Sequence, residues 1–390
     1  MTLPGNIDPA GIFVGEYQLV VTHPVSGEVI DIVTQDRIEH LKYSRKINDV
    51  GIMSLTISIN DNLANFISQV DLIFDIYRRN AIDGSLEYED AYFLQMYDRS
   101  QINLQGDEKI IISGKSIDHL LKRRRIFPED DPLGAGGFST KDGDAAFVLS
   151  QFISNQIVNP FTNSNRRQSQ VTLAPLPTIS FYDTQQRRNQ DDILLAVCQD
   201  IVNQVTEPVL DFRLIHTGAA QIRVDIAPRG SDKTVTTRAP LSLDFTLIST
   251  RRGNLRNPQL VVDRRDEQNF VLVAGQGIAD SRVFVSSTSS RLNDSPFNRK
   301  ESTIDSKTGN SLEELQDAGA VEIVNQLPIE EIKFEFFPGS AQSVYNVDWI
   351  MGDLITAEYA DYTEDHRIES VDITIQGANE SIEFNSKRIR

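Results

Sequence analysis

Residues 250–277 read TRRGNLRNPQLVVDRRDEQNFVLVAGQG, a stretch in which two apolar runs flank a strongly charged segment. The runs are 260–262 and 270–273, and both are rich in residues that favour β-strands. Gly253 favours a turn before the first run, and Pro258 suits the start or edge of a strand because it has no N–H to donate to a β-ladder. The pattern predicts a β-hairpin whose strands are joined by a charged turn.

Length and composition limit the class of protein. The chain has 390 residues, of which 39% are hydrophobic and 24% charged, enough material for about two to four domains with sizeable cores. The single cysteine, Cys198, excludes an internal disulfide and a cysteine-based metal site. The N-terminus lacks the pattern of a signal peptide, and no apolar run approaches the ~18 residues of a transmembrane helix, so we expect no membrane insertion.

The formal net charge of −18 bears on possible partners. Such a charge argues against binding that depends on neutralising phosphates, and against adhesion to an anionic bilayer. It suits a surface past which DNA moves without being held, although the charge taken alone favours ordinary solubility as its explanation. We therefore expect no specific nucleic-acid binding.

The chain is mostly β in pattern, with an α+β segment in the middle. Residues 38–59 alternate apolar and polar side chains, which predicts strands with one buried and one wet face. Residues 191–205 have the apolar spacing of an amphipathic helix, and a strand pair turning at Gly218 follows. Residues 126–240 are therefore predicted to form a separate α+β domain.

No pattern in the sequence predicts a catalytic, cofactor or metal site. The five histidines show no metal-ligand spacing, and there is no GxSxG motif. A glycosidase would need two facing carboxylates, for which Asp353 with Asp361 is one pair that could serve. A carbohydrate-binding adhesin would need exposed aromatic side chains, for which Tyr359 and Tyr362 are candidates. We expect a protein that is not an enzyme, and the β-rich adhesin stays an alternative.

Three segments, taken in order, carry a resemblance to a known family. They are YSRKINDVGIMSLTISIND at 43–61, IIISGKSIDHLLKRRRI at 110–126 and GNLRNPQLVVDRRDEQNFVLVAGQG at 253–277. Together they resemble the hub proteins of bacteriophage tail tips and baseplates, in the class that includes siphophage Gp37-like tail proteins. Each motif is degenerate, so the resemblance rests on their order and separation over most of the chain.

The resemblance implies a fold and a symmetry. Two β-barrel-like tube domains are expected, one at 1–125 and one built from 241–280 and 330–390. Residues 126–240 would form the outer α+β domain, and 281–329 would be an insertion. Three copies would then supply six similar domains, so a trimeric ring could match a six-fold tail ring.

The resemblance also implies a function and partners. The expected role is a structural hub that joins the six-fold tail tube or distal tail ring to the three-fold tip and lines the DNA passage. Expected partners are further copies of the chain, distal tail and tail tube proteins, the tape measure protein, and spike or fibre proteins. The expected location is the virion tail, assembled in the host cytoplasm. The hub of a contractile injection system is the neighbouring alternative.

Four arginines of the opening stretch are the candidate site residues in this interpretation. Arg251, Arg252, Arg264 and Arg265 lie in the two charged turns and are predicted to contact acidic neighbouring subunits. No catalytic residue, cofactor or metal ligand is assigned.

Overall fold

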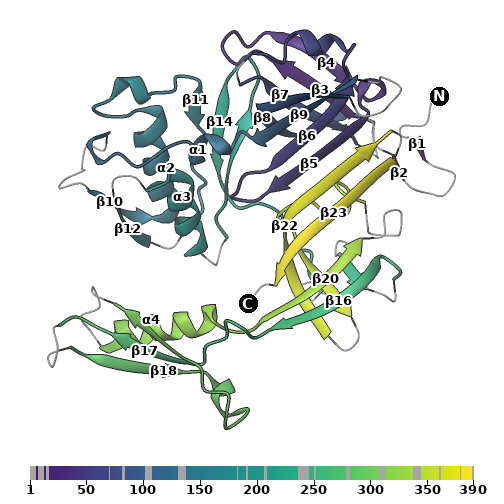
Figure 1. The fold of residues 1–390 in the computed structure, drawn as a ribbon. Coiled ribbons are helices and arrows are strands. Elements are labelled where there is room, and N and C mark those ends of the chain that lie inside the picture. Colours follow the sequence, from purple (N-terminus) through teal and green to yellow (C-terminus); the bar gives the residue numbers. More distant parts are fainter. Residues whose placement is uncertain are drawn as a thin grey trace. The chain divides into compact units, whose positions relative to one another are not determined.

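The computed structural model divides the chain into two compact units, residues 1–256 with 335–390 and residues 257–334 (Figure 1). Strands hold more residues than helices, which confirms the prediction of a mainly β protein. The described residues are 6–7, 13–14, 17–69, 71–80, 84–101, 108–130, 138–181, 183–189, 192–205, 209–235, 246–249, 252–277, 282–306, 312–336, 344–359, 362–377 and 379–388.

A sheet forms the centre of the first unit, and its described residues make eleven strands. The strand order is β15–β21–β22–β5–β6–β9–β8–β7–β3–β4, and β23 pairs with β22. The strands are β3 (Tyr17–Thr22), β4 (Val29–Thr34), β5 (His40–Lys46), β6 (Ile52–Ser58), β7 (Ile73–Arg79), β8 (Leu86–Gln101), β9 (Glu108–Ser116), β15 (Leu247–Ser249), β21 (Leu354–Tyr359), β22 (Tyr362–Gln376) and β23 (Asn379–Arg388).

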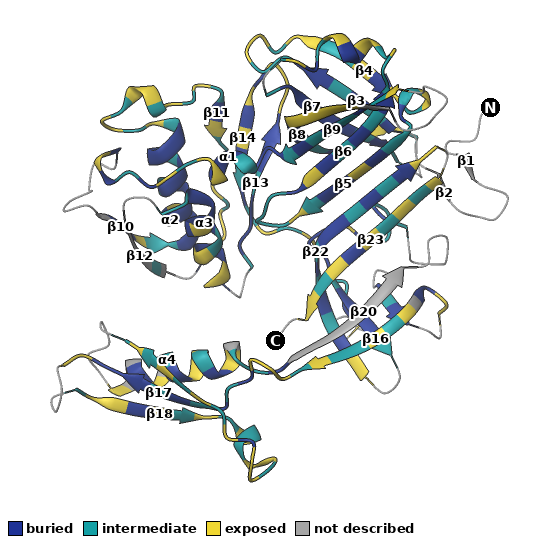
Figure 2. Ribbon diagram, in the orientation of Figure 1, coloured by how far each residue is buried: buried dark blue, intermediate teal, exposed yellow. Residues whose placement is uncertain are grey.

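Strand β6 shows how the sequence sets the two faces of this sheet. Met53, Leu55 and Ile57 are buried, and the hydroxyl residues between them are only partly covered (Figure 2). Successive side chains of a strand point to opposite faces, so the alternation decides which face meets the core. β6 pairs antiparallel with β5, and the two-residue pattern predicted over 38–59 is confirmed.

Strands from both ends of the chain share the sheet. β22 pairs antiparallel with β5, from Ser370 opposite Lys46 to Gln376 opposite His40. The sequence interpretation assigns these strands to two separate tube domains, whereas the structure joins them side by side. Over the described residues the strand order does not return on itself, so this sheet is not a closed barrel. The four-part domain division remains a prediction.

The helical part of the first unit lies where the α+β domain is predicted. Helices α2 and α3 share one apolar core with the end of the large sheet, and Cys198 is buried in it. Asp144 caps α2 by accepting hydrogen bonds from the backbone N–H groups of Ala146 (2.9 Å) and Phe147 (3.3 Å). The elements are α1 (His119–Lys122), β10 (Phe138–Asp144), α2 (Ala145–Ile153), β11 (Val171–Leu173), β12 (Asp183–Asn189), α3 (Leu194–Asn203), β13 (Phe212–His216) and β14 (Ile222–Ile226).

Pairing within this part follows the sequence expectation. β13 and β14 form the antiparallel pair predicted on either side of Gly218, and β11 joins β14 in parallel. β10 pairs with β12. The remaining short elements of the first unit are β1 (Asn6–Ile7), β2 (Phe13–Val14), the 3₁₀ turns η1 (Gln35–Arg37), η2 (Asn62–Asn65), η3 (Pro128–Asp130) and η5 (Ser164–Arg166), and the π-helical turn η4 (Ser154–Val158).

The hairpin predicted over 250–277 is wrong. β16 (Leu255–Asp263) pairs with β20 (Ile329–Phe336), whereas β17 (Phe270–Ala274) lies between β18 (Phe284–Thr288) and β19 (Glu301–Asp305). The charged segment therefore connects two sheets. Periodicity identifies a strand but not its partner, because pairing depends on contacts distant in sequence.

Helix α4 (Leu312–Asn325) covers one face of the three-stranded sheet in the second unit. Leu315 and Ile323 pack against the buried valines of β17 and β18. A Cβ atom at Gly319 would lie 2.3 Å from the side-chain oxygen of Ser287, so a glycine allows the helix to approach the sheet this closely. The 3₁₀ turn η7 (Ser290–Asn293) follows β18.

Candidate functional site

The structure gives places to three of the four residues considered for catalysis and sugar binding, Asp353, Tyr359 and Tyr362. Asp353 is buried and accepts hydrogen bonds from the N–H groups of Ser231 (2.7 Å) and Ile350 (2.9 Å), so its carboxylate supports the backbone. Asp361 lies outside the described residues. Tyr359 and Tyr362 are opposite each other on β21 and β22. Within the described part of the chain, no three His, Cys, Asp or Glu side chains group as metal ligands would.

Among the described residues, no helix is both long enough and apolar enough to cross a membrane.

The three described candidate arginines, Arg252, Arg264 and Arg265, lie near the two ends of β16. Arg251 lies outside the described residues, and Arg252 lies in the exposed turn before the strand, where its N–H donates to Ser249 Oγ (3.2 Å). Arg264 and Arg265 follow the strand and have different partners. Arg265 pairs with Asp263, with 3.0 Å between Nε and Oδ1, and its side chain is 85% exposed.

Arg264 belongs to a cluster around one buried carboxylate, which we call the Glu267 cluster. Glu267 lies 2.9 Å from Arg264 Nε, 2.9 Å from Arg291 Nε and 3.5 Å from Lys300 Nζ. The Glu267 side chain is 1% exposed, whereas the three cations are between 31% and 43% exposed. Burial alone would raise the pKa of Glu267, but the hydrogen bonds from Arg264 and Arg291 outweigh it and lower that pKa.

The first unit contains buried ion pairs between side chains of different strands of its large sheet. Arg78 on β7 pairs with Glu380 on β23 (Nε to Oε1, 2.9 Å), and their side chains are 2% and 4% exposed. Arg45 on β5 pairs with Glu89 on β8 at 2.6 Å, and Tyr345 Oη donates to the same carboxylate at 3.1 Å. These contacts join the first hundred residues to the last fifty.

Ionic contacts also join the α+β part to the sheet. His216 on β13 lies 2.8 Å from Asp75 on β7, and both side chains are buried. Asp211 accepts from Arg367 of β22 at 2.5 Å and from the amide of Asn48 at 2.9 Å. Burial raises the pKa of Asp75, and the hydrogen bond with His216 opposes that effect.

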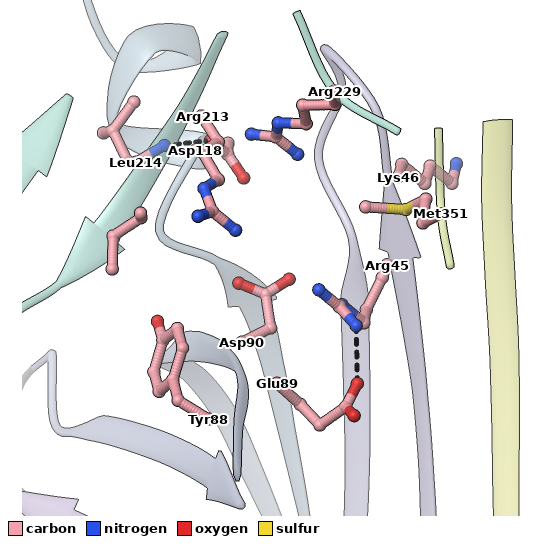
Figure 3. A pocket seen from close by; sticks show the side chains of 11 residues that line it. Arg45, Lys46, Tyr88, Glu89, Asp90, Asp118, Arg213, Leu214, Arg229 and Met351 are labelled. Carbon is pink, nitrogen blue, oxygen red and sulfur yellow. Dashed lines mark hydrogen bonds and ion pairs between the residues drawn. The ribbon is translucent and has the colours of Figure 1, made fainter. Parts of the chain in front are cut away.

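A hollow beside this junction is charged and small. Figure 3 shows the carboxylates of Asp90 and Asp118 among the side chains of Arg45, Arg213 and Arg229. Its volume of about 10 Å³ is room for about one water molecule, far below the ~300 Å³ of a ligand pocket. The hollow therefore has little room for any ligand larger than a water molecule.

Asp118 is a titratable group of this hollow whose surroundings alter its pKa. Its carboxylate accepts a hydrogen bond from the N–H of Leu214 (2.8 Å), which connects β13 to the end of β9. Burial, with the nearby Asp90 carboxylate, raises the pKa of Asp118 to about 7. The side chain is thus poised to change its charge near neutral pH.

Two of the edge strands of the large sheet, β4 and β23, differ in how their backbone groups are satisfied. On β4, the N–H of Ile32 donates to Asp31 Oδ1 (2.8 Å) and its C=O accepts from Arg37 Nη1 (2.8 Å). Arg37 is held by Asp61 (Nε to Oδ2, 2.9 Å), so side chains occupy the backbone groups of Ile32 on this edge. On β23, no strand among the described residues pairs with the outer edge.

Sequence reasoning missed all of these ionic contacts. Arg78 and Glu380 are 302 residues apart, and each stands alone in an ordinary strand pattern. For the Glu267 cluster, the repeated charges at 263–267 signalled a polar surface but not that one carboxylate would be buried.

Comparison with known proteins identifies the family. The model of the family described as Siphovirus ReqiPepy6 Gp37-like protein matches residues 32–384. The chain belongs to this family. The resemblance to siphophage tail proteins seen in the sequence is thereby confirmed, and the family is one of structural tail proteins rather than enzymes. Among curated proteins, none matches the chain in sequence.

Solved structures share the fold along nearly the whole chain. The 43 kDa tail protein of prophage MuSo2 from Shewanella oneidensis is 11% identical with a TM-score of 0.57, covering 96% of this chain and 98% of that one. Prophage tail protein gp18 from Listeria monocytogenes is 11% identical with a TM-score of 0.53, covering 96% and 94%. A chain of the Francisella PdpA–VgrG complex is 11% identical with a TM-score of 0.51; 96% of this chain matches 53% of that one.

Proposed function

We propose that this Gp37-like protein is the structural hub of a phage tail tip, forming a trimeric ring between the six-fold tail tube and the three-fold tip. The observation that carries the proposal is the family match over 32–384, together with a fold like that of prophage tail proteins over at least 94% of both chains. A hub is a scaffold, so the proposed role needs no enzymatic activity. Its partners would be copies of itself and other tail components.

The open edge of β23 supports contact between copies. A strand with unpaired N–H and C=O groups is a ready template for another chain, and β23 presents ten residues, Asn379–Arg388, on that edge. Neighbouring subunits in a ring could cover it. The side chains over β4 make that edge less available for strand pairing.

The face of the large sheet that is turned away from its apolar core is the surface we propose to line the DNA passage. Register places Ser381, Thr374, Lys42, Ser54 and Ser113 in one row across five strands, and none of them is buried. Such a row offers hydroxyl groups and a single cation. Phosphate binding depends chiefly on several basic residues acting together, so this row alone would not hold DNA.

The arginines at the ends of β16 remain proposed subunit contacts. Arg252 and Arg265 are exposed and suited to acidic neighbours, and Arg251 is proposed with them. Arg264 is proposed as a subunit contact too, but its guanidinium already pairs with Glu267 within the same chain.

A contractile injection system is the second candidate. The likeness to a chain of a PdpA–VgrG complex supports it, since the fold of this protein matches about half of that chain. A contractile sheath in particles that contain this protein would favour the second candidate over the siphophage tail.

The test is the oligomeric state and location of the protein. Mass photometry of the purified chain, and electron microscopy of particles viewed along the tail axis, should show three copies around a central channel. A chain that stays monomeric at high concentration and is missing from purified particles would overturn the proposal.

A further inference from the structure

The end of β9 and the short helix α1 carry a group of basic side chains, which we call the basic end. Its members are Lys115 and the run Lys122–Arg125. Three carboxylates belong to the same region. Asp118 lies within the segment, and Asp71 pairs with Arg123 at 3.1 Å. Asp192 lies beside the end of the segment. With all three carboxylates counted against the five cations, the basic end keeps a net charge of +2.

Most cations of the basic end are not neutralised within the chain. Among the described residues, Lys115, Lys122 and Arg124 have no ion-pair partner. Burial and the neighbouring Arg166 lower the pKa of Arg124. Burial and then the charges of nearby cations lower the pKa of His119 to about 4. The basic end therefore gathers positive charges that an anion from outside the chain would stabilise.

The β22–β23 end of the same sheet carries the opposite charge. Asp372 on β22 and Glu383 on β23 stand directly opposite each other in the antiparallel ladder, and we call them the acidic pair. Like charges in these positions repel, and neither carboxylate has an ion-pair partner among the described residues. Lys42 lies one row away, opposite Thr374, so a charge of −1 remains even when it is counted. Glu383 is exposed, on the strand whose outer edge is open.

The register places the acidic pair and the basic end on one face of the sheet (Figure 1). Glu383, Asp372 and Ser44 are successive partners across β23, β22 and β5, and Ile52 on β6 faces Lys115 on β9. The N–H of Ile52 donates to Ser44 Oγ (2.9 Å), which joins the two halves of this row. Four steps of ~4.8 Å between strands separate Glu383 from Lys115 by about 19 Å, more than the ~8 Å over which charges interact at physiological salt. Within one copy the two ends cannot neutralise each other.

We propose that, in the ring, the basic end of one copy contacts the acidic pair of the next copy. The inference rests on the proposed hub function and names two surfaces that meet in it. Copies that each carry −18 repel one another, so contact is favoured where the local charge changes sign. Two different surfaces of one chain that bind each other repeat head to tail, and such contacts close into a ring when the rotation fits.

The charge of the whole chain favours carboxylates over nucleic acid as the occupant of the basic end. A duplex that bound five cations would lie close to a surface that is otherwise strongly acidic, and its phosphates would be repelled there. The acidic pair of a second copy is small and lies next to an open strand edge, so it can approach without that repulsion.

The experiment measures association of the full chain by sedimentation velocity over a range of protein concentrations. Lys122→Glu and, separately, Glu383→Lys should each weaken trimer formation roughly tenfold, because each brings like charges together between copies. Glu383→Lys should not lower the melting temperature, since it removes the repulsion from Asp372. The variant that carries both changes should regain most of the wild-type association. Glu28→Lys, at an exposed position between β3 and β4, changes the net charge equally and should leave association unaltered.

The outcomes separate this inference from the hub function. A wild-type trimer that both single variants leave unchanged would overturn the inference and keep the hub. Weakening by both variants without recovery in the double variant would also overturn it, because the two surfaces would then have different partners. Binding of a DNA duplex at low salt that Lys122→Glu abolishes, with trimer formation unaffected, would assign the basic end to nucleic acid instead. A wild-type chain that forms no trimer and is missing from particles would overturn the hub function and this inference with it.

Discussion

The Arg78–Glu380 pair and the Glu267 cluster use the same chemistry in opposite ways. In the first, both partners are buried between strands from the two ends of the chain. In the second, only the anion is buried, and three cations reach solvent around it. A pair with both partners inside can only support the fold, whereas cations left at the surface also remain available to another molecule.

The largest expected effect comes from breaking the buried pair. Glu380→Gln would leave the Arg78 guanidinium in the interior without its carboxylate, at a cost of roughly 3–5 kcal/mol in the free energy of unfolding. Urea denaturation of the purified chain measures it. The double variant Arg78→Met with Glu380→Leu should cost less than the single variant, since no unpaired charge stays inside. A single variant as stable as the wild type would show that the pair does not support the fold.

The next effect is a pH dependence at the charged hollow. The pKa of Asp118 is about 7 when folded and near its ordinary value when unfolded, so between about pH 4 and 7 the folded state binds more protons. Its contribution to stability is therefore complete below about pH 4 and is lost as the pH rises through 7. Asp118→Asn should remove this part of the profile, on the order of 1 kcal/mol or more between pH 5 and pH 8. Identical profiles for wild type and variant would refute the assignment.

A smaller effect is expected in the second cluster. Glu267→Gln removes the charge that the three cations share, but those cations can turn to water, so the cost should be about 1–2 kcal/mol. The loss should be local. Hydrogen exchange should speed up over residues 289–300 while strands of the large sheet keep their protection. Equal loss of protection from exchange in both units would show that Glu267 stabilises the whole chain, as the Arg78–Glu380 pair is expected to do.

The smallest effect on stability is expected at Arg265. Arg265→Glu should leave the free energy of unfolding nearly unchanged, because its side chain is 85% exposed and surface pairs contribute little. The same change should weaken assembly of the trimer in sedimentation experiments. Arg264→Glu is the contrasting variant, since it places a second carboxylate beside Glu267 and should disturb the Glu267 cluster as well. Unchanged assembly of Arg265→Glu would remove this residue from the proposed interface.

Local signals in the sequence predicted local features well. The alternation along β6 and the strand pair that turns at Gly218 follow from residues only a few positions apart. The family, too, was recognisable from three separated segments. The pairing of β16 with β20 was not predictable, because about seventy residues lie between these strands. For the same reason, no pattern could join Glu380 to Arg78.

The backbone contacts on the edge of β4 affect how copies of the chain can pair before they assemble into a tail. Tail proteins that accumulate in a cell before use are exposed to uncontrolled polymerisation if both ends of their sheets accept further strands. Here Arg37 and Asp31 occupy the backbone groups of Ile32, so β-pairing between copies has a stop on one side. A strand of another copy that added to β4 would have to displace these hydrogen bonds, so this edge disfavours strand pairing between copies.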